Sequence, residues 1–227
     1  MSILRNLMTA WLPQDCLLCA AASGDALLCD ECRRDLPRLP DALCPVCAEA
    51  SPGGQVCGSC LKQAPHFDAT IAALPYAFPV DKLIQALKYR RRLATADFLA
   101  RAMLAGPQPS GDMVVPLPLA LPRLRQRGFN QAAELARPLA RALHLPLELD
   151  GCVRCRDTVP QVALPWQARQ KNIRHAFECS LDLSGKSVVV VDDVMTTGAT
   201  LDEFARTLKA HGAARVTNWV AARTLRD

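Results

Sequence analysis

Aromatic residues are scarce in this sequence: they make up 5% of its 227 residues, whereas half of the residues are hydrophobic. We therefore expect a core built mainly from aliphatic side chains. The sequence also lacks an apolar run near the roughly 18 residues that a membrane-spanning helix requires. Residues 1–13 have neither the apolar core nor the cleavage site of a signal peptide. These absences predict a cytoplasmic protein with no membrane span.

A complete nucleotide-hydrolase loop is absent as well. Such enzymes need the pattern Gly-x4-Gly-Lys-Ser/Thr between a strand and a helix. The nearest match, Gly185-Lys186-Ser187, precedes a predicted strand, and Ser180 stands where the first glycine belongs. This excludes a P-loop enzyme, although one strand of the chain ends in two aspartates.

Cysteine, by contrast, is abundant, with 11 residues. Eight of them form four Cys-x-x-Cys pairs, and nine residues separate the first pair from the second and the third from the fourth. A reducing cytoplasm favours metal binding over disulfides, and this spacing lets both thiolates of a pair reach one tetrahedral zinc ion. The sequence therefore predicts one or two structural zinc sites with the ligands Cys16, Cys19, Cys29, Cys32, Cys44, Cys47, Cys57 and Cys60.

Zinc would take the place of a hydrophobic core in this segment, which has few large apolar residues. A structural zinc ion contributes about 10–16 kcal/mol of apparent binding free energy. We expect a zinc-ribbon module over residues 1–64 and a second domain over residues 65–227. Sequential pairing of the Cys-x-x-Cys pairs is the simplest arrangement, and an interleaved pairing or a single zinc ion is also compatible with the sequence. A thioredoxin-like redox role expects one such pair that opens a helix after a strand, which four tandem copies do not resemble.

A fifth Cys-x-x-Cys pair, Cys152 and Cys155, has no matching partner pair. Only Cys179, His144 and His175 could complete a ligand set for it. We interpret these cysteines as incidental thiols.

Patterns of strands and helices alternate over residues 65–227. Apolar runs predict strands at residues 69–76, 113–117, 188–191 and 215–222, and helical periodicity predicts helices at residues 80–104, 128–143 and 201–211. We expect the first helix to break near residues 91–95 and Pro138 to kink or divide the second. Residues 145–182 are polar and rich in Pro, Arg and Gln, so we expect little regular structure there. The alternation predicts an α/β fold with a mostly parallel sheet flanked by helices and ligands at the carboxyl ends of the strands.

The stretch Val188–Thr200 is the most informative part of the chain. Four consecutive valines predict a strand that is buried on both faces, and Asp192 and Asp193 follow where this strand ends. A turn rich in threonine and glycine then leads into a helix. Main-chain amides and the dipole at a helix N-terminus favour a phosphate group. The sequence therefore predicts a phosphate cradle beside two carboxylates that face sugar hydroxyls or a divalent metal.

These thirteen residues resemble the phosphoribosyl-pyrophosphate signature of type I phosphoribosyltransferases, without a mismatch. The resemblance implies a type I phosphoribosyltransferase fold in which Asp192 and Asp193 are catalytic and bind the ribose hydroxyls. It also implies a 5′-phosphate site formed by Thr196, Thr197, Gly198, Ala199 and Thr200. We expect Mg²⁺ to accompany phosphoribosyl pyrophosphate, because this ion commonly bridges phosphates to carboxylates.

Two groups of basic residues are candidates for holding the pyrophosphate, since arginine offers a bidentate, permanently charged fork. The first group, which we place on a loop after Leu119, is Arg123, Arg125 and Arg127. The second group lies in the polar stretch 145–182, which could close as a lid, and a solvated helix face is its alternative interpretation. It consists of Arg169, Lys171 and Arg174.

The order of motifs along the chain resembles the ComF family of competence-related proteins. The resemblance is carried by Val114–Leu119, by the Arg-Gly-Phe-Asn-Gln motif at residues 127–131, by Thr158–Gln161, and by the cysteine pairs and the acidic signature. It covers nearly the whole chain and implies a role in DNA uptake during natural transformation.

Three functions are compatible with this resemblance. The first is an enzyme that transfers a phosphoribosyl group to an unidentified acceptor. The second is a non-catalytic protein that handles single-stranded DNA, and the third is a docking protein for a competence helicase that uses the fold as a scaffold. The net charge of +5 and the basic cluster Lys88–Arg92 suit a polyanionic partner. A solvated helix face explains this cluster equally well.

Overall fold

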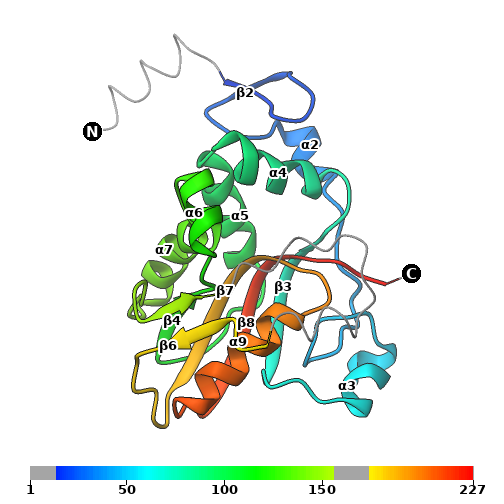
Figure 1. Ribbon diagram of the computed structural model, residues 1–227. Coiled ribbons are helices and arrows are strands. Elements are labelled where there is room, and N and C mark those ends of the chain that lie inside the picture. Colours follow the sequence, from blue (N-terminus) through cyan, green and yellow to red (C-terminus); the bar gives the residue numbers. More distant parts are fainter. Residues whose placement is uncertain (1–13, 156–173, 227) are drawn as a thin grey trace.

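A four-stranded parallel sheet forms the centre of the protein (Figure 1). The computed structural model describes residues 14–155 and 174–226. The strand order is β3-β8-β7-β4, and all three neighbouring pairs run parallel. The predicted α/β class with a parallel sheet is confirmed. The strands are β3 (Ala69–Pro75), β4 (Met113–Pro116), β7 (Ser187–Met195) and β8 (Arg215–Arg223).

Both faces of this sheet are buried, which explains the unbroken run of valines in β7. Val188 and Val190 belong to one core cluster, and Val189 and Val191 belong to the other. The alternation arises because successive side chains of a strand point to opposite faces. None of the four is more than 1% exposed.

Three helices cover the face of the sheet that carries Val189 and Val191. One helix and a hairpin cover the opposite face, which carries Val188 and Val190 (Figure 1). The first layer consists of α4 (Val80–Arg90), α5 (Ala94–Leu104) and α7 (Gln131–Leu143). The second consists of α9 (Ala199–Ala210) and the antiparallel hairpin of β5 (Cys152–Arg154) and β6 (Phe177–Cys179). The hairpin corrects the expectation of little regular structure in residues 145–182. Residues 156–173, which include the Thr158–Gln161 motif, lie outside the described residues.

The predicted break in the first long helix is confirmed. Helix α4 ends at Arg90, and Arg91 adopts a left-handed conformation with φ of 52° before α5 begins. Pro138 does not divide the second helix, because α7 continues through this residue as one helix. Its apolar stripe, which includes Leu135 and Leu139, is fully buried against the sheet. This burial offsets the loss of one helical hydrogen bond at the proline.

Helix α6 (Leu121–Arg127) replaces the loop that we expected after Leu119. Pro122 lies in the first turn, where its missing N–H group has no helical partner to lose. Gly128 ends the helix with φ of 82°, a left-handed conformation that glycine adopts without strain. Pro and Gly therefore stand at the two ends of a helix in a stretch that we had placed on a loop.

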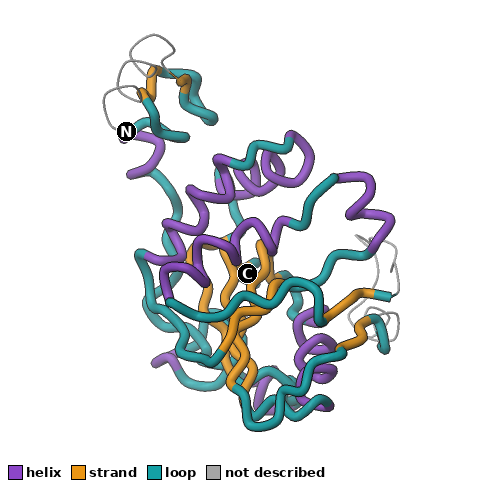
Figure 2. The backbone as a smooth tube through the Cα atoms, turned by 90° about the vertical axis from the view of Figure 1, so that its left-hand side faces the viewer, coloured by secondary structure: helices purple, strands orange, loops and turns teal. Residues whose placement is uncertain are grey.

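The cysteine-rich segment contacts the rest of the protein in two separate places (Figure 1). Its first part contains β1 (Gln14–Asp15), β2 (Ala22–Gly24) and α2 (Asp30–Arg34), and it packs on Leu83 of α4 and Phe98 of α5. Figure 2 shows this part, beside the N-terminal marker, projecting from the molecule. Its second part contains the short 3₁₀ helix η1 (Pro52–Gly54) and α3 (Gly58–Lys62), and it packs beside β3 and β8. Within the described ranges, no helix has the length and apolar character to cross a membrane.

Candidate functional site

A pocket of about 160 Å³ lies at the carboxyl end of β7, where parallel α/β sheets usually bind ligands. The end of β7 and the start of α9 form its floor. The chain after β4, helix α6, the first residues of α7, the last turn of α4 and strand β5 form its walls. The predicted residues that line it are Asp192, Asp193, Thr196, Thr197, Gly198, Ala199, Thr200, Arg123 and Arg127.

The β7–α9 loop (Thr196–Gly198) has the geometry of a cradle for an anion. Gly198 is the N-cap of α9 and has φ of 82°. A Cβ atom at this position would lie 2.6 Å from the Cε atom of Met195. The Thr197 hydroxyl accepts a hydrogen bond from the Ala199 amide at 3.4 Å. The amides of the next residues, Thr200 and Leu201, belong to the first turn of α9. The N–H groups of a first turn have no hydrogen-bond partner within the helix. These amides can therefore serve a bound phosphate.

The two aspartates at the end of β7 have different surroundings. Asp192 accepts a hydrogen bond from the Asp193 amide at 2.8 Å. Burial raises the pKa of Asp192 to about 8, and the neighbouring charge of Asp193 adds to this effect. The Asp193 side chain is 8% exposed and forms an ion pair with the Lys88 ammonium at 2.7 Å. The site thus holds two adjacent carboxyl groups against one paired cation.

Lys88 lines the pocket, whereas the sequence analysis named it only as part of the basic cluster Lys88–Arg92 and not as a site residue. Burial lowers the pKa of Lys88, but the charges of Asp193 and Asp192 outweigh this effect and raise it above its ordinary value. Lys88 lies four residues after the buried Ile84 and one residue after the buried Leu87. That spacing places Lys88 beside the apolar stripe of α4. The spacing is the signal in the sequence that could have identified Lys88 as a residue that faces the sheet.

The arginines of α6 divide into two faces. Arg123 and Arg127, one helical turn apart, line the pocket, whereas Arg125 is exposed and does not line it. The guanidinium carbon of Arg127 lies 5.5 Å from the centre of the Tyr89 ring. The structure therefore brings two of the three predicted arginines to the acidic pair.

Of the second predicted basic group, only Arg174 lies within the described residues, and it does not line this pocket. Arg174 lines a separate cavity of about 320 Å³, together with His66, His175 and Arg206. Arg169 and Lys171 lie outside the described residues.

Three further polar residues line the pocket: Arg154, which the sequence analysis did not name, and Asn130 and Gln131, which it named only as part of the motif at residues 127–131. Asn130 donates to the Leu117 carbonyl at 3.0 Å and caps α7 by accepting from the Ala132 amide at 3.1 Å. Gln131 is 3% exposed, and among the described residues its Nε2 atom has no hydrogen-bond partner. Arg154 reaches the pocket from β5 and stacks on Phe177. A buried amide without a partner favours a polar ligand at this place.

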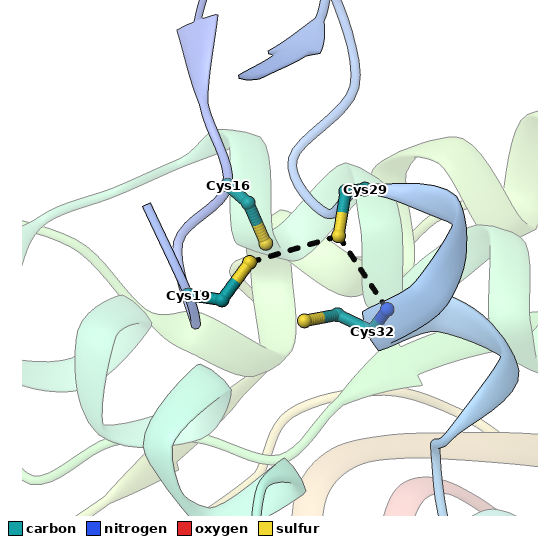
Figure 3. Close-up of side chains that lie close together, drawn as sticks. All are labelled: Cys16, Cys19, Cys29 and Cys32. Atoms are coloured by element: carbon teal, nitrogen blue, oxygen red, sulfur yellow. Dashed lines mark hydrogen bonds between the residues drawn. The ribbon is translucent and has the colours of Figure 1, made fainter. Parts of the chain in front are cut away.

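The eight predicted zinc ligands form two separate clusters of four. Cys16, Cys19, Cys29 and Cys32 form the first cysteine cluster, shown in Figure 3. Cys44, Cys47, Cys57 and Cys60 form the second cysteine cluster. Within each cluster the four sulfur atoms lie within 4.8 Å of one another. This grouping corresponds to the sequential pairing.

The sulfur separations fit tetrahedral zinc. The Sγ atoms of Cys19 and Cys29 are 3.7 Å apart, and those of Cys47 and Cys57 are 3.6 Å apart. A Zn–S bond of about 2.3 Å in a tetrahedron implies an S–S distance of about 3.8 Å. Burial raises the pKa of Cys16, but amide hydrogen bonds from Cys19 and Cys29 outweigh it and lower the pKa to about 6. At Cys16, these amides thus favour the thiolate form that zinc binds.

The fifth Cys-x-x-Cys pair is not part of a metal cluster in the described residues. Cys152 and Cys179 face each other across the β5–β6 hairpin, with their sulfur atoms 3.4 Å apart. Cys155 is exposed and contacts the His175 carbonyl. Cys152 packs in the core, which agrees with the interpretation of these residues as thiols outside the zinc sites.

Comparisons with known proteins agree with this architecture. A model of the phosphoribosyl transferase domain matches residues 130–225, and a model of the double zinc ribbon domain matches residues 7–61. These matches confirm the predicted phosphoribosyltransferase fold and the structural zinc.

Relatives extend over most of the chain. The DNA utilization protein YhgH of Escherichia coli (strain K12) is 36% identical over 225 residues, which cover 94% of this chain and 99% of that protein. Competence protein F of Haemophilus influenzae is 30% identical over 172 residues, which cover 71% of this chain and 75% of that protein. Among solved structures, the glutamine phosphoribosylpyrophosphate amidotransferase of B. subtilis aligns with a TM-score of 0.39 and 23% identity, covering 56% of this chain and 26% of that one.

Proposed function

The chain belongs to the ComF family, and we propose that it binds phosphoribosyl pyrophosphate in the pocket at the carboxyl end of β7. One observation carries the proposal: an acidic pair, the N-terminus of α9 and cations from α4 and α6 line the same pocket. These groups correspond to the three polar parts of the ligand: ribose hydroxyls, 5′-phosphate and pyrophosphate.

The 5′-phosphate would occupy the β7–α9 loop and the start of α9. Gly198 adopts a positive φ at which a Cβ atom would collide with Met195, so glycine permits this loop conformation, and the loop carries the hydroxyls of Thr196 and Thr197. The dipole of α9, a helix of 12 residues, favours an anion at this end. The ribose would then point its hydroxyls at Asp192 and Asp193, which lie near the end of β7, with Val194 and Met195 between them and the loop.

The pyrophosphate would face the cationic wall of Lys88, Arg123 and Arg127. The stacking of Arg127 on Tyr89 limits the orientations of its guanidinium, and Lys88 is already held by Asp193. Preorganised cations of this kind stabilise a leaving pyrophosphate without costly rearrangement. A phosphoribosyl transfer breaks the bond between ribose C1 and pyrophosphate, so these side chains would oppose the charge that develops on the leaving group.

The donor set also fits Mg²⁺. The carboxylates of Asp192 and Asp193 are hard oxygen ligands, and this ion prefers one or two carboxylates together with phosphate oxygens. When bound, Mg²⁺ would neutralise charge on the pyrophosphate. Asp192 would lose its proton in that state, because a divalent cation lowers the pKa of a neighbouring carboxyl group.

Isothermal titration with phosphoribosyl pyrophosphate tests the proposal. We expect binding to the wild type in the presence of Mg²⁺, loss of binding in Asp192→Asn, and unchanged binding in the control Asp97→Asn, an exposed aspartate on α5 that pairs with Arg101. Ribose 5-phosphate and inorganic pyrophosphate, titrated separately, assign the two subsites. A wild type that releases no heat at saturating ligand and Mg²⁺ overturns the proposal.

A second candidate function is the handling of single-stranded DNA during DNA uptake, which the names of the relatives favour. A basic surface borders the pocket: Tyr89 is 71% exposed, and the exposed residues Arg90, Arg91 and Arg92 follow it. Arg91 donates to the Gln126 carbonyl at 3.4 Å and so joins this surface to α6. Single strands bind where cations track the backbone and aromatic rings stack on bases.

Binding of a labelled single strand over a range of salt concentrations tests this second function. We expect affinity to fall with salt, and to fall further in Tyr89→Ala and in Arg90→Gln. The control is Arg101→Gln, an exposed arginine on α5. Affinity that is independent of salt, or equal in all variants, refutes a DNA site on this surface.

A further inference from the structure

Arg223 connects the second cysteine cluster to the β7–α9 loop. It is the last residue of β8 and lies beside Met195, the last residue of β7, in the parallel register. Its side chain is 2% exposed. A buried guanidinium needs partners for its charge and for its five N–H groups, and the positions of these partners are therefore informative.

One side of the guanidinium contacts the second cysteine cluster. Its Nε atom donates to the carbonyl of Cys47, a zinc ligand, at 2.9 Å. Its Nη2 atom donates to the Glu49 carboxylate at 3.1 Å. The other oxygen of Glu49 accepts from the Arg226 amide at 2.9 Å, so this carboxylate is held on both sides.

The other side of the guanidinium contacts the candidate phosphate site. Its Nη1 atom donates to the Met195 carbonyl at 3.3 Å and also to the Thr196 carbonyl. Thr196 is the first residue of the β7–α9 loop, two residues before Gly198. A single side chain therefore holds the Cys47 carbonyl and the Thr196 carbonyl at once.

The first cysteine cluster has no comparable link among the described residues. It packs on Leu83 and Phe98, and in the described part of the chain the hydrogen bonds of its cysteine sulfurs remain within the cysteine-rich segment. The second cluster, in contrast, packs Val46 and Cys47 against the same core as Met195. The two metal sites thus differ in their relation to the pocket.

We propose that zinc in the second cysteine cluster positions the β7–α9 loop through Arg223, so that anion binding in the pocket depends on this zinc and not on the zinc of the first cluster. Without the metal, Cys47 loses the bond that fixes its backbone, and Arg223 no longer has a fixed partner on that side. The Thr196 carbonyl and the amides after it then sample more orientations. Arg223 acts as a positioning residue, since it touches the loop and not the ligand. The part of this inference that concerns affinity rests on the proposed binding of phosphoribosyl pyrophosphate.

Hydrogen exchange of the zinc-loaded, ligand-free protein tests the coupling. Cys57→Ser and Cys29→Ser are matched variants, because each removes the third ligand of its cluster and each cysteine is the N-cap of a five-residue helix. We expect Cys57→Ser to accelerate amide exchange at residues 196–201 by about tenfold, and Cys29→Ser to leave it within about twofold. Exchange in α7 is the internal control and should not change. Equal acceleration in both variants, or none in either, overturns the proposal.

Glu49→Gln keeps the test decisive if Cys57→Ser does not fold. This substitution leaves all zinc ligands intact and removes the charge that Arg223 faces, so we expect faster exchange at residues 196–201 with unchanged zinc content. Arg226→Lys is its control, because Arg226 also contacts Glu49 but is exposed and does not touch the loop. Normal exchange in Glu49→Gln overturns the proposal.

Titration of the same variants extends the test to the ligand. We expect the affinity for phosphoribosyl pyrophosphate to fall about tenfold in Glu49→Gln and to stay unchanged in Arg226→Lys. A wild type that does not bind this ligand refutes the proposed function alone, because the exchange measurements still decide whether zinc and loop are coupled. Changed exchange with unchanged affinity in Glu49→Gln overturns the dependence of binding on this link.

Discussion

The raised pKa of Asp192 predicts that the acidic pair lowers the stability of the ligand-free protein. A carboxyl group whose pKa rises from 3.8 to about 8 on folding binds more protons in the folded than in the unfolded chain between these values. Stability therefore decreases as pH rises from about 4 to about 8 and is then constant with respect to this group. Asp192→Asn removes the ionisation, and its amide oxygen can still accept from the Asp193 amide.

The size of the effect follows from the shift. Each pKa unit corresponds to about 1.4 kcal/mol, so four units set an upper limit of about 5–6 kcal/mol above about pH 8. The introduced amide also loses hydration in the pocket, and we expect about half of that limit. The unfolding free energy of the variant should therefore exceed that of the wild type by about 2–3 kcal/mol near pH 8. Near pH 5, we expect this gain to be about 1 kcal/mol or less. The raised pKa of Lys88 lies above this range, so Lys88 stays charged throughout and does not contribute to the difference.

Denaturant unfolding of both proteins in zinc-containing buffer, across this pH range, measures the difference. Asp97→Asn is the control, because this side chain is 59% exposed, and we expect no pH-dependent gain from it. A variant that is less stable than the wild type, or a difference that is independent of pH, refutes the reasoning. Combined with lost ligand binding in Asp192→Asn, a gain in stability would mark the acidic pair as retained for binding.

Three further predictions concern the other parts of the protein. Gly198→Ala places a Cβ atom against Met195 at a φ of 82°, so we expect a loss of about 1–2 kcal/mol in unfolding free energy and weaker ligand binding. Wild-type affinity in this variant would contradict the proposal that the β7–α9 loop binds the phosphate. Arg127→Gln should weaken pyrophosphate binding at least about tenfold, whereas Arg125→Gln on the exposed face of α6 should not; calorimetry on the pair decides, and equal effects would contradict the division of the two faces. Metal analysis should find two zinc ions per chain and one in Cys19→Ser, and a wild type with a single zinc would show that one cysteine cluster does not bind the metal.

The floor of the pocket could be predicted from the sequence because it is continuous in the chain. The buried strand, the acidic pair and the turn follow one another in Val188–Thr200, and local rules are sufficient to interpret each. The two-sided burial of β7 was likewise visible in its four valines. Local sequence decides these features, since strand burial and helix capping depend on neighbouring residues.

The walls of the pocket could not be predicted in the same way. Lys88 reaches Asp193 from a helix about one hundred residues earlier, and Arg154 reaches the pocket from a hairpin. Their positions depend on how α4 and β5 pack on opposite faces of the sheet, which no local pattern contains. The division between Arg125 and Arg127 depends on the helical phase of α6, and the sequence analysis missed it because it placed these arginines on a loop.

The change in composition near residue 64 suggests a domain boundary, but strong interactions join the cysteine-rich segment to the second domain. Arg223 of β8 donates to the Cys47 carbonyl and to the Glu49 carboxylate, and the Thr70 amide of β3 donates to the Pro45 carbonyl at 3.3 Å. The Arg223 guanidinium has almost no contact with solvent, so separation from Glu49 would leave a buried charge without its carboxylate, at a cost of about 3–5 kcal/mol. That cost is a large fraction of the stability of a typical domain. The second cysteine cluster is therefore part of the structure that holds the pocket, whereas the first rests on α4 and α5 at the far end of the same segment.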